Sequence, residues 1–200
     1  MRVLIACEFS GIVRESFAKR GHDAWSCDLL PTESPGKHFQ CDVFDALQYN
    51  WDLMIAHPPC TYLAVSGAGW FYHPEDKHLP FKKRRPHPKF PNRQKDKKEA
   101  ELFFMALINA NINKICVENP IGTMSTFYRK PNQIVQPWQF GHGETKATCF
   151  WLKNLPKLTP TKIVEGREQR NHYMSPSPDR PKNRSRTYQG IADAMADQWG

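Results

Sequence analysis

The sequence predicts an α/β protein in which helices flank a mostly parallel sheet. Three observations lead to this prediction. Short apolar runs, such as residues 3–6 and 53–56, recur along the chain, and segments with helical spacing separate them. Polar residues follow directly after these runs, as they do at the carboxyl ends of parallel strands. A length of 200 residues is enough for one such domain, so we expect a single domain over residues 1–200.

The composition indicates a folded protein with a polyanionic partner. Hydrophobic residues make up 40% of the chain, and Lys plus Arg outnumber Asp plus Glu by 28 to 20. With a pI near 9.2, nucleic acid is the first candidate partner. The six cysteines form no C-x-x-C pair, which argues against a zinc ribbon or a disulfide framework and favours reduced thiols in a cytoplasm. No apolar run is long enough for a signal peptide or a membrane span.

The beginning of the chain predicts a βαβ unit. It contains a strand, an amphipathic helix and a second strand at residues 3–6, 12–20 and 22–27. The first turn has only Gly11 and lacks G-x-G-x-x-G, which argues against a dinucleotide. An adenosyl cofactor has no pyrophosphate and needs fewer glycines. Asp28, which follows the second strand, could accept hydrogen bonds from its ribose, and a solvated loop acid is the alternative.

The next strand ends in a turn that presents a thiol. After a loop over 30–40 and a short helix that ends near Leu47, the apolar run 53–56 leads into residues 57–60, with the sequence His-Pro-Pro-Cys. Two prolines make this turn rigid, and it follows the carboxyl end of a strand. Cys60 is therefore a candidate nucleophile. A small buried hydrophobic residue is the alternative.

A long irregular stretch follows the candidate nucleophile. Residues 81–98 contain nine Lys or Arg residues, and their three prolines exclude a continuous helix. Aromatic residues precede them at 70–72. We expect a basic mobile loop at about 64–98 whose cations, Arg93 among them, contact phosphates of nucleic acid, because such long loops in compact domains are usually functional or disordered. A solvated charge run is the alternative.

The second half of the chain predicts an acid beside Cys60. A helix over 99–110 precedes an apolar strand at 115–117, which Glu118 and Asn119 follow. Neighbouring parallel strands place their following residues on the same edge of a sheet, so we expect Cys60 and Glu118 there together. The remaining pattern predicts two strands, a connecting loop and a terminal helix at 133–139, 145–152, 167–186 and 188–199.

The order of these motifs resembles that of the DNA (cytosine-5)-methyltransferases, and in particular of a compact, phage-type member. The Pro-Pro-Cys motif of the family matches residues 58–60, and its Glu-Asn-Val motif matches 118–120, where Pro replaces Val. The first family motif, Asp-Leu-Phe-x-Gly, matches 7–11 at Phe and Gly but not at the acid. The acid after the second strand matches Asp28, and the next Asp motif of the family matches Asp42.

Other parts of the family pattern are altered or missing. The closing Gly-Asn-Ala-Val helix matches 192–195 only loosely. Residues 145–148 stand where the family has a Gln-x-Arg-x-Arg strand, so the role of that strand could pass to Lys146 or be lost. The target-recognition domain of the family has no counterpart, since only about 35 residues separate Trp151 from Arg186. The resemblance therefore implies short or relaxed sequence specificity.

The resemblance implies a Rossmann-like, S-adenosylmethionine-dependent methyltransferase fold and methyl transfer to C5 of cytosine in DNA. The donor would be S-adenosyl-L-methionine or a modified analogue. The Cys60 thiolate would add to C6 of a flipped-out cytosine. A protonated or hydrogen-bonded Glu118 would meet the charge that develops toward N3 and O2, and Asn119 would hold Glu118 and the turn in position.

The resemblance also implies partners and binding residues. The partner would be double-stranded DNA, with a separate specificity protein as a further candidate, and the enzyme would be a monomer in the cytoplasm, that of a bacterial host if a phage encodes it. Gly11 would leave room for the methionine portion of the donor. The cofactor-binding residues would be Phe9, Ser10, Gly11, Asp28, Leu29, Asp42, Val43, Pro58 and Ala194. The substrate-binding residues would be Pro59, Lys146, Thr148, Lys82, Lys83, Arg84 and Arg85.

Three other functions remain open. An exocyclic amino-methyltransferase would have Asp, Asn or Ser before Pro-Pro and an aromatic residue after it, whereas His57 and Cys60 stand there. A non-catalytic nucleic-acid-binding module fits the charge but leaves Cys60 and Glu118 unexplained. A metal site at His57 and Cys60 lacks further ligands at the usual spacings.

Overall fold

The computed structural model describes residues 1–200 and confirms an α/β protein with a mostly parallel sheet flanked by helices. The sheet has seven strands in the order β3-β2-β1-β4-β5-β7-β6. The first five in this order are parallel, and β7 runs antiparallel to β5 and β6. The strands are β1 (Arg2–Ala6), β2 (Asp23–Asp28), β3 (His38–Gln40), β4 (Leu53–Ala56), β5 (Lys114–Pro120), β6 (Gln133–Val135) and β7 (Thr148–Lys153).

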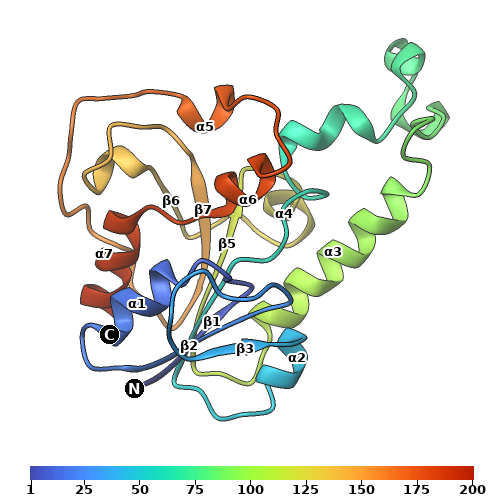
Figure 1. Cartoon of the computed structure of the whole chain (residues 1–200). Coiled ribbons are helices and arrows are strands. Elements are labelled where there is room, and N and C mark those ends of the chain that lie inside the picture. The colour runs from blue at the N-terminus through green and yellow to red at the C-terminus, as the bar shows by residue number, and fades with distance from the viewer.

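Helices cover both faces of this sheet, as Figure 1 shows. The helices are α1 (Ile12–Ala18), α2 (Val43–Ala46), α3 (Arg93–Ile108), α4 (Met124–Phe127), α5 (Arg170–Tyr173), α6 (Arg180–Ser185) and α7 (Gln189–Trp199). α1 and α7 pack on one face around a core that includes Phe17 and Trp199. α2 and α3 pack on the other face, around Phe104 and Trp151. Because both faces are covered, the central strands are continuous apolar runs rather than alternating ones.

The sheet reverses its direction of growth between β1 and β4. The chain leaves β1 toward α1 on one face and leaves β4 toward α3 on the other. The two strands pair in parallel from Val3 opposite Leu53 to Ala6 opposite Ala56. In open α/β sheets, ligands bind outside the carboxyl ends of the strands at such a switch point. The residues that follow Ala6 and Ala56 therefore border the expected ligand site.

Glu8 shapes the turn after β1. Its buried carboxylate accepts hydrogen bonds from the backbone N–H groups of Val13 at 2.8 Å and Arg14 at 3.3 Å. Both groups lie in the first turn of α1, where N–H donors have no partner within the helix. Glu8 thus caps α1, and the turn closes through positive φ angles of 58° at Cys7 and 76° at Gly11.

Several element boundaries differ from the prediction. α3 begins at Arg93 rather than at 99, so the last six residues of the expected loop 64–98 are helical. The sequence pattern missed this start because the first turns of the helix are charged and have no apolar residues at helical spacing. The predicted strand 133–139 shortens to β6, since Pro137 cannot donate to a ladder and begins a short 3₁₀ helix. The expected connecting loop 167–186 contains α5 and α6. No helix is long and apolar enough to cross a membrane.

Residues 61–92, which we call the arm, leave the sheet edge after Cys60 and return into α3. Figure 1 shows this stretch extending away from the sheet together with the N-terminal part of α3. It contains three short 3₁₀ helices, at Val65–Trp70, Pro74–His78 and Phe81–Lys83. Its centre is Asp76, which is 3% exposed and accepts hydrogen bonds from both the backbone N–H and the guanidinium of Arg85, each at 2.7 Å.

Arg93 joins the arm to the body of the protein. Its guanidinium donates to the carbonyl of Thr61 at 2.8 Å, directly after the candidate nucleophile. It also lies against the rings of Tyr62, Phe71 and Phe90, at 5.0, 4.9 and 5.9 Å from their centroids. A guanidinium stacked on several rings combines cation–π attraction with packing, so Arg93 fixes the base of the arm against α3. The expectation that Arg93 binds phosphate is wrong, because its side chain is buried.

Candidate active site

The ends of β4 and β5 bring together residues that the sequence predicted on one edge. These strands pair in parallel with Ala56 opposite Val117, so the residues that follow, His57 and Glu118, are neighbours. The Nδ1 atom of His57 and the Oε2 atom of Glu118 lie 2.5 Å apart. Cys60 ends the same Pro-Pro turn. The predicted adjacency of the two strands therefore holds.

His57 and Glu118 form a buried ion pair, with side chains only 10% and 15% exposed. Burial lowers the pKa of His57, but the hydrogen bond and charge of Glu118 outweigh burial, so this pKa is raised. Burial raises the pKa of Glu118, but the hydrogen bond and charge of His57 and the charge of Lys146 outweigh it, so this pKa is lowered. The pair therefore favours a protonated imidazole beside an ionised carboxylate. The Nε2 atom of His57 is buried and has no partner.

The sequence motifs did not identify His57 as the partner of Glu118 and suggested it only as a metal ligand. The signal was present in the register, because His57 follows β4 directly and Glu118 of β5 stands one position beyond the last residue that pairs with β4. No cluster of three or more His, Cys, Asp or Glu side chains suited to a metal ion is present in the structure. His57 is thus best understood through its bond to Glu118.

Backbone and side-chain bonds join the turn after β4 to the loop after β5. Asn119 donates from Nδ2 to the carbonyl of Pro58 at 3.1 Å, as expected of a residue that holds the turn. The N–H of Thr123 donates to the carbonyl of Leu63 at 2.8 Å. A Cβ atom on Gly122 would lie only 1.9 Å from that same carbonyl oxygen, so only glycine fits this close approach. These contacts hold the two turns against each other.

Cys60 is a free cysteine whose side chain reaches solvent. The protein atoms around it still remove part of its hydration, and this desolvation, followed by the charge of Glu118, raises the pKa of its thiol. The positive charges of Lys146 and Arg184 act in the opposite direction. The thiol is therefore mostly protonated at neutral pH, and any further positive charge or nearby base would increase its thiolate fraction.

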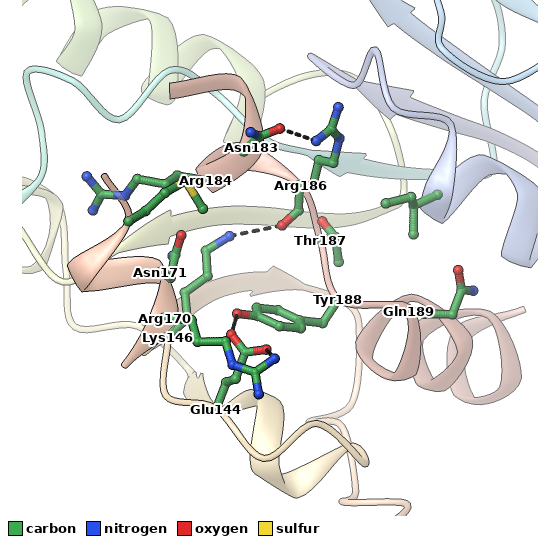
Figure 2. A pocket seen from close by; sticks show the side chains of 12 residues that line it. Glu144, Lys146, Arg170, Asn171, Asn183, Arg184, Arg186, Thr187, Tyr188 and Gln189 are labelled. Carbon is green, nitrogen blue, oxygen red and sulfur yellow. Dashed lines mark hydrogen bonds and ion pairs between the residues drawn. The ribbon is translucent and has the colours of Figure 1, made fainter. Parts of the chain in front are cut away.

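A cavity of about 420 Å³ opens between the N-terminal ends of α1 and α7 and the chain that contains α5 and α6. This volume falls within the roughly 300–1,000 Å³ of ligand pockets. Figure 2 shows its lining, which is mainly polar. The lining residues are Ile12, Glu144, Lys146, Arg170, Asn171, Met174, Asn183, Arg184, Arg186, Thr187, Tyr188 and Gln189. A much smaller cavity shares Lys146, Thr187 and Tyr188 with it and reaches Glu118 and Thr148.

Most charges in the larger cavity are already paired. Tyr188 donates its hydroxyl to Glu144 at 2.6 Å, and Arg170 donates to Glu168 at 2.5 Å. Arg186 binds both carboxylate oxygens of Glu33, at 2.7 and 2.8 Å. Among the lining residues, the sequence motifs identified only Lys146, because the stretch 167–186 has no apolar periodicity and is typical of a connecting loop.

The predicted cofactor residues lie at the ends of β1 to β4, except Ala194 in α7, and none of them lines either cavity. Asp28 accepts from the N–H of Leu30 with one carboxylate oxygen, and Leu29 is 72% exposed beside it. Asp42 caps α2 through the N–H of Phe44. The side chains of Val43 and Ala194 pack into the two cores, which corrects the expectation that they contact a ligand. Phe9, Ser10 and Pro58 are also buried.

Gly11 has a different role from the expected one. A Cβ atom at this position would lie 2.7 Å from the guanidinium of Arg14, so Arg14 occupies the space that we expected to hold the methionine portion of a donor. Arg14 is 1% exposed and donates to the hydroxyls of Ser26 and Thr32 and to the carbonyl of Ser34. Glycine at 11 therefore accommodates a buried arginine that anchors the loop between β2 and β3.

The predicted substrate residues fall into two groups. Lys82 and Lys83 are exposed and make no ion pair. Arg85 is instead bound to Asp76 within the arm. Arg84 donates to the carbonyls of Leu79 and Lys77, so both arginines stabilise the arm.

Near Cys60, the predicted substrate residues also differ in accessibility. Pro59 is exposed beside the thiol. Thr148 is buried and donates its hydroxyl to the carbonyl of Lys146 at 3.1 Å. Lys146 donates to the carbonyl of Arg186 at 3.1 Å and keeps its side chain in both cavities. Of these three, Lys146 is the residue best placed to reach a bound molecule.

Comparisons with known proteins place few limits on function. No protein-family model matches the chain, and no curated protein matches it. One solved structure that matches is described as a "putative DNA modification methyltransferase encoded within" a prophage of E. coli. It has 14% sequence identity to this chain and a TM-score of 0.47, over 88% of this chain. This chain spans 55% of that protein's chain, and a likeness at this level supports no conclusion about activity.

Proposed function

We propose that this chain transfers a methyl group from S-adenosyl-L-methionine to C5 of cytosine in DNA, with Cys60 as a covalent nucleophile. The observation that carries the proposal is the arrangement at the ends of β4 and β5. An exposed thiol stands there on a rigid Pro-Pro turn, beside the buried pair of His57 and Glu118. A nucleophile next to a proton-holding pair suits covalent addition to an electron-poor ring.

The proposed reaction has three steps. The Cys60 thiolate forms a bond to C6 of a flipped-out cytosine, and the electrons of the C5–C6 double bond shift toward N3 and O2. C5 would then form a bond to the methyl group of the donor while the bond between that methyl group and the donor sulfur breaks, so that S-adenosylhomocysteine leaves with the electron pair. A base removes the proton from C5, the double bond forms again, and Cys60 leaves as a thiolate.

The pair of His57 and Glu118 supports the first step with the proton on His57 rather than on Glu118. The lowered pKa of Glu118 keeps its carboxylate ionised at neutral pH, so it cannot itself donate a proton to N3. The raised pKa of His57 makes the imidazole the proton-holding member of the pair. We therefore assign the proton to His57, with Glu118 as its hydrogen-bond partner. Of the two forms of Glu118 that we expected, protonated or hydrogen-bonded, this assignment keeps the hydrogen-bonded one.

The residues at the end of β2 fit an adenosyl donor. Asp28 uses only one carboxylate oxygen within the protein, at 2.9 Å from the N–H of Leu30, which leaves the other oxygen for ribose hydroxyls. Leu29 is 72% exposed and can pack against an adenine ring. A modified donor with the same adenosyl group would fit equally well.

A non-catalytic nucleic-acid-binding module is the second candidate. The observation that favours it is the raised pKa of Cys60, since a protonated thiol is a poor nucleophile. The rate of Cys60 alkylation by iodoacetamide across pH distinguishes the two candidates. A catalytic site predicts that bound donor, whose sulfonium is positive, shifts this profile to lower pH, whereas a binding module predicts the same profile with and without donor.

Methyl transfer is tested by incubating the protein with duplex DNA and S-adenosyl-L-methionine and analysing the nucleosides by mass spectrometry. We expect 5-methyl-2′-deoxycytidine from the natural sequence and none from Cys60→Ala, which removes only the covalent step and should retain DNA binding. Cys41→Ala is the matched control and should remain active. DNA with 5-fluorocytosine should trap a covalent adduct on Cys60. An N-methylated nucleoside, or the absence of any methylated nucleoside, would contradict the proposal.

A further inference from the structure

One cation in the larger cavity has no partner in the protein. Arg184 of α6 makes no ion pair, and its Nε atom is buried without an acceptor. Figure 2 shows Arg184 in the lining beside Asn171, with no marked bond to any neighbour. Arg186, only two residues away, is held by Glu33 and by the side chain of Asn183. Arg184 is thus the unpaired arginine of this cavity.

The cavity lining contains four cations and a single acid. Asn171, Asn183 and Thr187 line it together with Lys146 and Arg184. Its one acid, Glu144, already accepts the hydroxyl of Tyr188 and lies 4.0 Å from Arg170. A buried N–H without an acceptor is unfavourable, and an oxyanion would remove that penalty. A guanidinium also matches two oxygens of one phosphate group in a way that an ammonium does not.

The cavity is electrostatically coupled to the candidate nucleophile. The charges of Lys146 and Arg184 both lower the pKa of Cys60, in opposition to desolvation and to Glu118. Lys146 lines the larger cavity and also the smaller one, which reaches Glu118. A ligand held by Arg184 and Lys146 would therefore lie close to the group that reacts at Cys60.

We propose that this cavity binds a phosphate group of the substrate through Arg184 and Lys146. The inference rests on the proposed function and specifies its substrate, which would carry a phosphate next to the reacting base. Lys146 uses one donor on the carbonyl of Arg186 and keeps two for such a ligand. The phosphate can be a diester of DNA or the monoester of a free nucleotide, since both present unesterified oxygens.

Protection of Cys60 from iodoacetamide tests the site without requiring catalysis. The probes are inorganic phosphate, deoxycytidine monophosphate and a 12-base-pair duplex, and peptide mass spectrometry measures the alkylation rate at Cys60. We expect each effective probe to slow alkylation, and Arg184→Ala to raise its half-protecting concentration by about tenfold, as for removal of a charge-assisted hydrogen bond. Arg184→Lys should recover only part of this effect. Lys157→Ala, an exposed charge outside the cavity, should behave as the natural sequence does.

The salt dependence of duplex binding separates the two phosphate sources. If the ligand is a DNA diester, Arg184→Ala should reduce the slope of log affinity against log salt by about 0.9, the value for one neutralised phosphate. If it is a monoester, deoxycytidine monophosphate should protect Cys60 at lower concentration than the duplex, and the slope should not change.

Unchanged protection by all three probes in a folded Arg184→Ala protein would overturn the inference. If circular dichroism shows that this variant does not fold, Arg184→Gln replaces it, because glutamine keeps a polar side chain without the charge. Phosphate protection without any methylated nucleoside would support this site and contradict methyl transfer. Methyl transfer together with unchanged protection in Arg184→Ala would support the proposed function and contradict the phosphate site.

Discussion

The arm and the C-terminal segment, residues 167–187, are both basic stretches whose sequences are typical of loops, but they hold their arginines in different ways. In the arm, Arg85 binds Asp76, which lies nine residues away. In the C-terminal segment, Arg186 binds Glu33, which lies 153 residues away in the loop between β2 and β3. The arm therefore carries its own counter-charge, whereas the C-terminal segment depends on another part of the protein.

This difference shows why a count of cations does not identify those that are free for a ligand. In the arm, Arg85 binds an acid and Arg84 binds backbone carbonyls, whereas the exposed lysines make no ion pair; they are Lys77, Lys82, Lys83 and Lys89. In the C-terminal segment, Arg170 and Arg186 are paired with acids, whereas Arg184 has no acceptor in the protein. In each stretch, acids and backbone carbonyls hold some of the cations, and these pairings are visible only in the folded chain.

The largest expected effect comes from removing the two acids. Asp76→Asn should expose the arm to proteolysis, because it removes a buried carboxylate that accepts several hydrogen bonds from Arg85. Glu33→Gln should release the C-terminal segment more weakly, since its ion pairs are partly exposed and salt screens them. Limited proteolysis with mapped cleavage sites, at low and high salt, measures both. Equal cleavage of both stretches in either variant would contradict the comparison.

Acid pH should release the two stretches in sequence. The bonds to Arg85 lower the pKa of Asp76 far below its usual range, and those to Arg186 and Lys182 lower the pKa of Glu33 by less. A carboxylate whose pKa is lower in the folded than in the unfolded protein stabilises the fold. This stabilisation is fully present above the unfolded-state pKa and is lost as the pH falls through the folded-state pKa. The C-terminal segment should therefore open at a higher pH than the arm. Hydrogen exchange followed by mass spectrometry over a descending pH series checks the order, and simultaneous opening would contradict it.

A moderate effect is expected at Gly11, because it supports the loop that carries Glu33. Gly11→Ala would combine a positive φ with a Cβ atom 2.7 Å from Arg14, which anchors this loop. Gly21→Ala is the matched control, since Gly21 also has a positive φ but no atom within 4 Å of the added Cβ. A non-glycine residue at a positive φ costs about 1–3 kcal/mol, and each kcal/mol lowers Tm by roughly 2–4 °C in a protein of this size. Calorimetry should show a larger destabilisation for Gly11→Ala than for Gly21→Ala. Equal destabilisation would show that the Arg14 side chain can move away from the added Cβ atom without loss of stability.

The smallest expected effect is on DNA affinity through the arm. Lys82→Ala with Lys83→Ala should flatten the slope of log affinity against log salt by up to about 0.9 for each phosphate that these lysines neutralise, and should leave the protein as stable as before. Arg84→Ala with Arg85→Ala should instead loosen the arm. Binding titrations at several salt concentrations, alongside proteolysis, measure the two outcomes. An unchanged slope in the lysine variant would identify those lysines as a solvated surface.

The sheet and the positions of Cys60 and Glu118 could be predicted from the sequence because both depend on local signals. Strands β1 and β4 are buried on both faces and so appear as apolar runs, and the residues after parallel strands share an edge. The rigidity of the Pro-Pro turn follows from its two prolines alone. Each of these features can be predicted from a few consecutive residues of the sequence.

The parts that could not be predicted depend on distant pairs. The burial of Arg14 needs hydroxyls and carbonyls 12 to 21 residues away, and nothing near Arg14 in the chain indicates that it is internal. The pairing of His57 with Glu118 needs the strand register. The cavity needs α5 and α6 to fold back over the ends of α1 and α7. Polar side chains of this kind lack a periodic pattern, so only the tertiary structure identifies their partners.

The close approach of Gly122 to Leu63 has a consequence for the thermodynamics of binding. Because the chain on both sides of the nucleophile is already fixed, its conformational entropy decreases when the protein folds and not when substrate arrives. The entropy decrease on binding should then come from the substrate and from the exposed lysine side chains of the arm. A calorimetric titration would separate these sources, since shortening the arm lysines should change the binding entropy while the nucleophile turn contributes almost none.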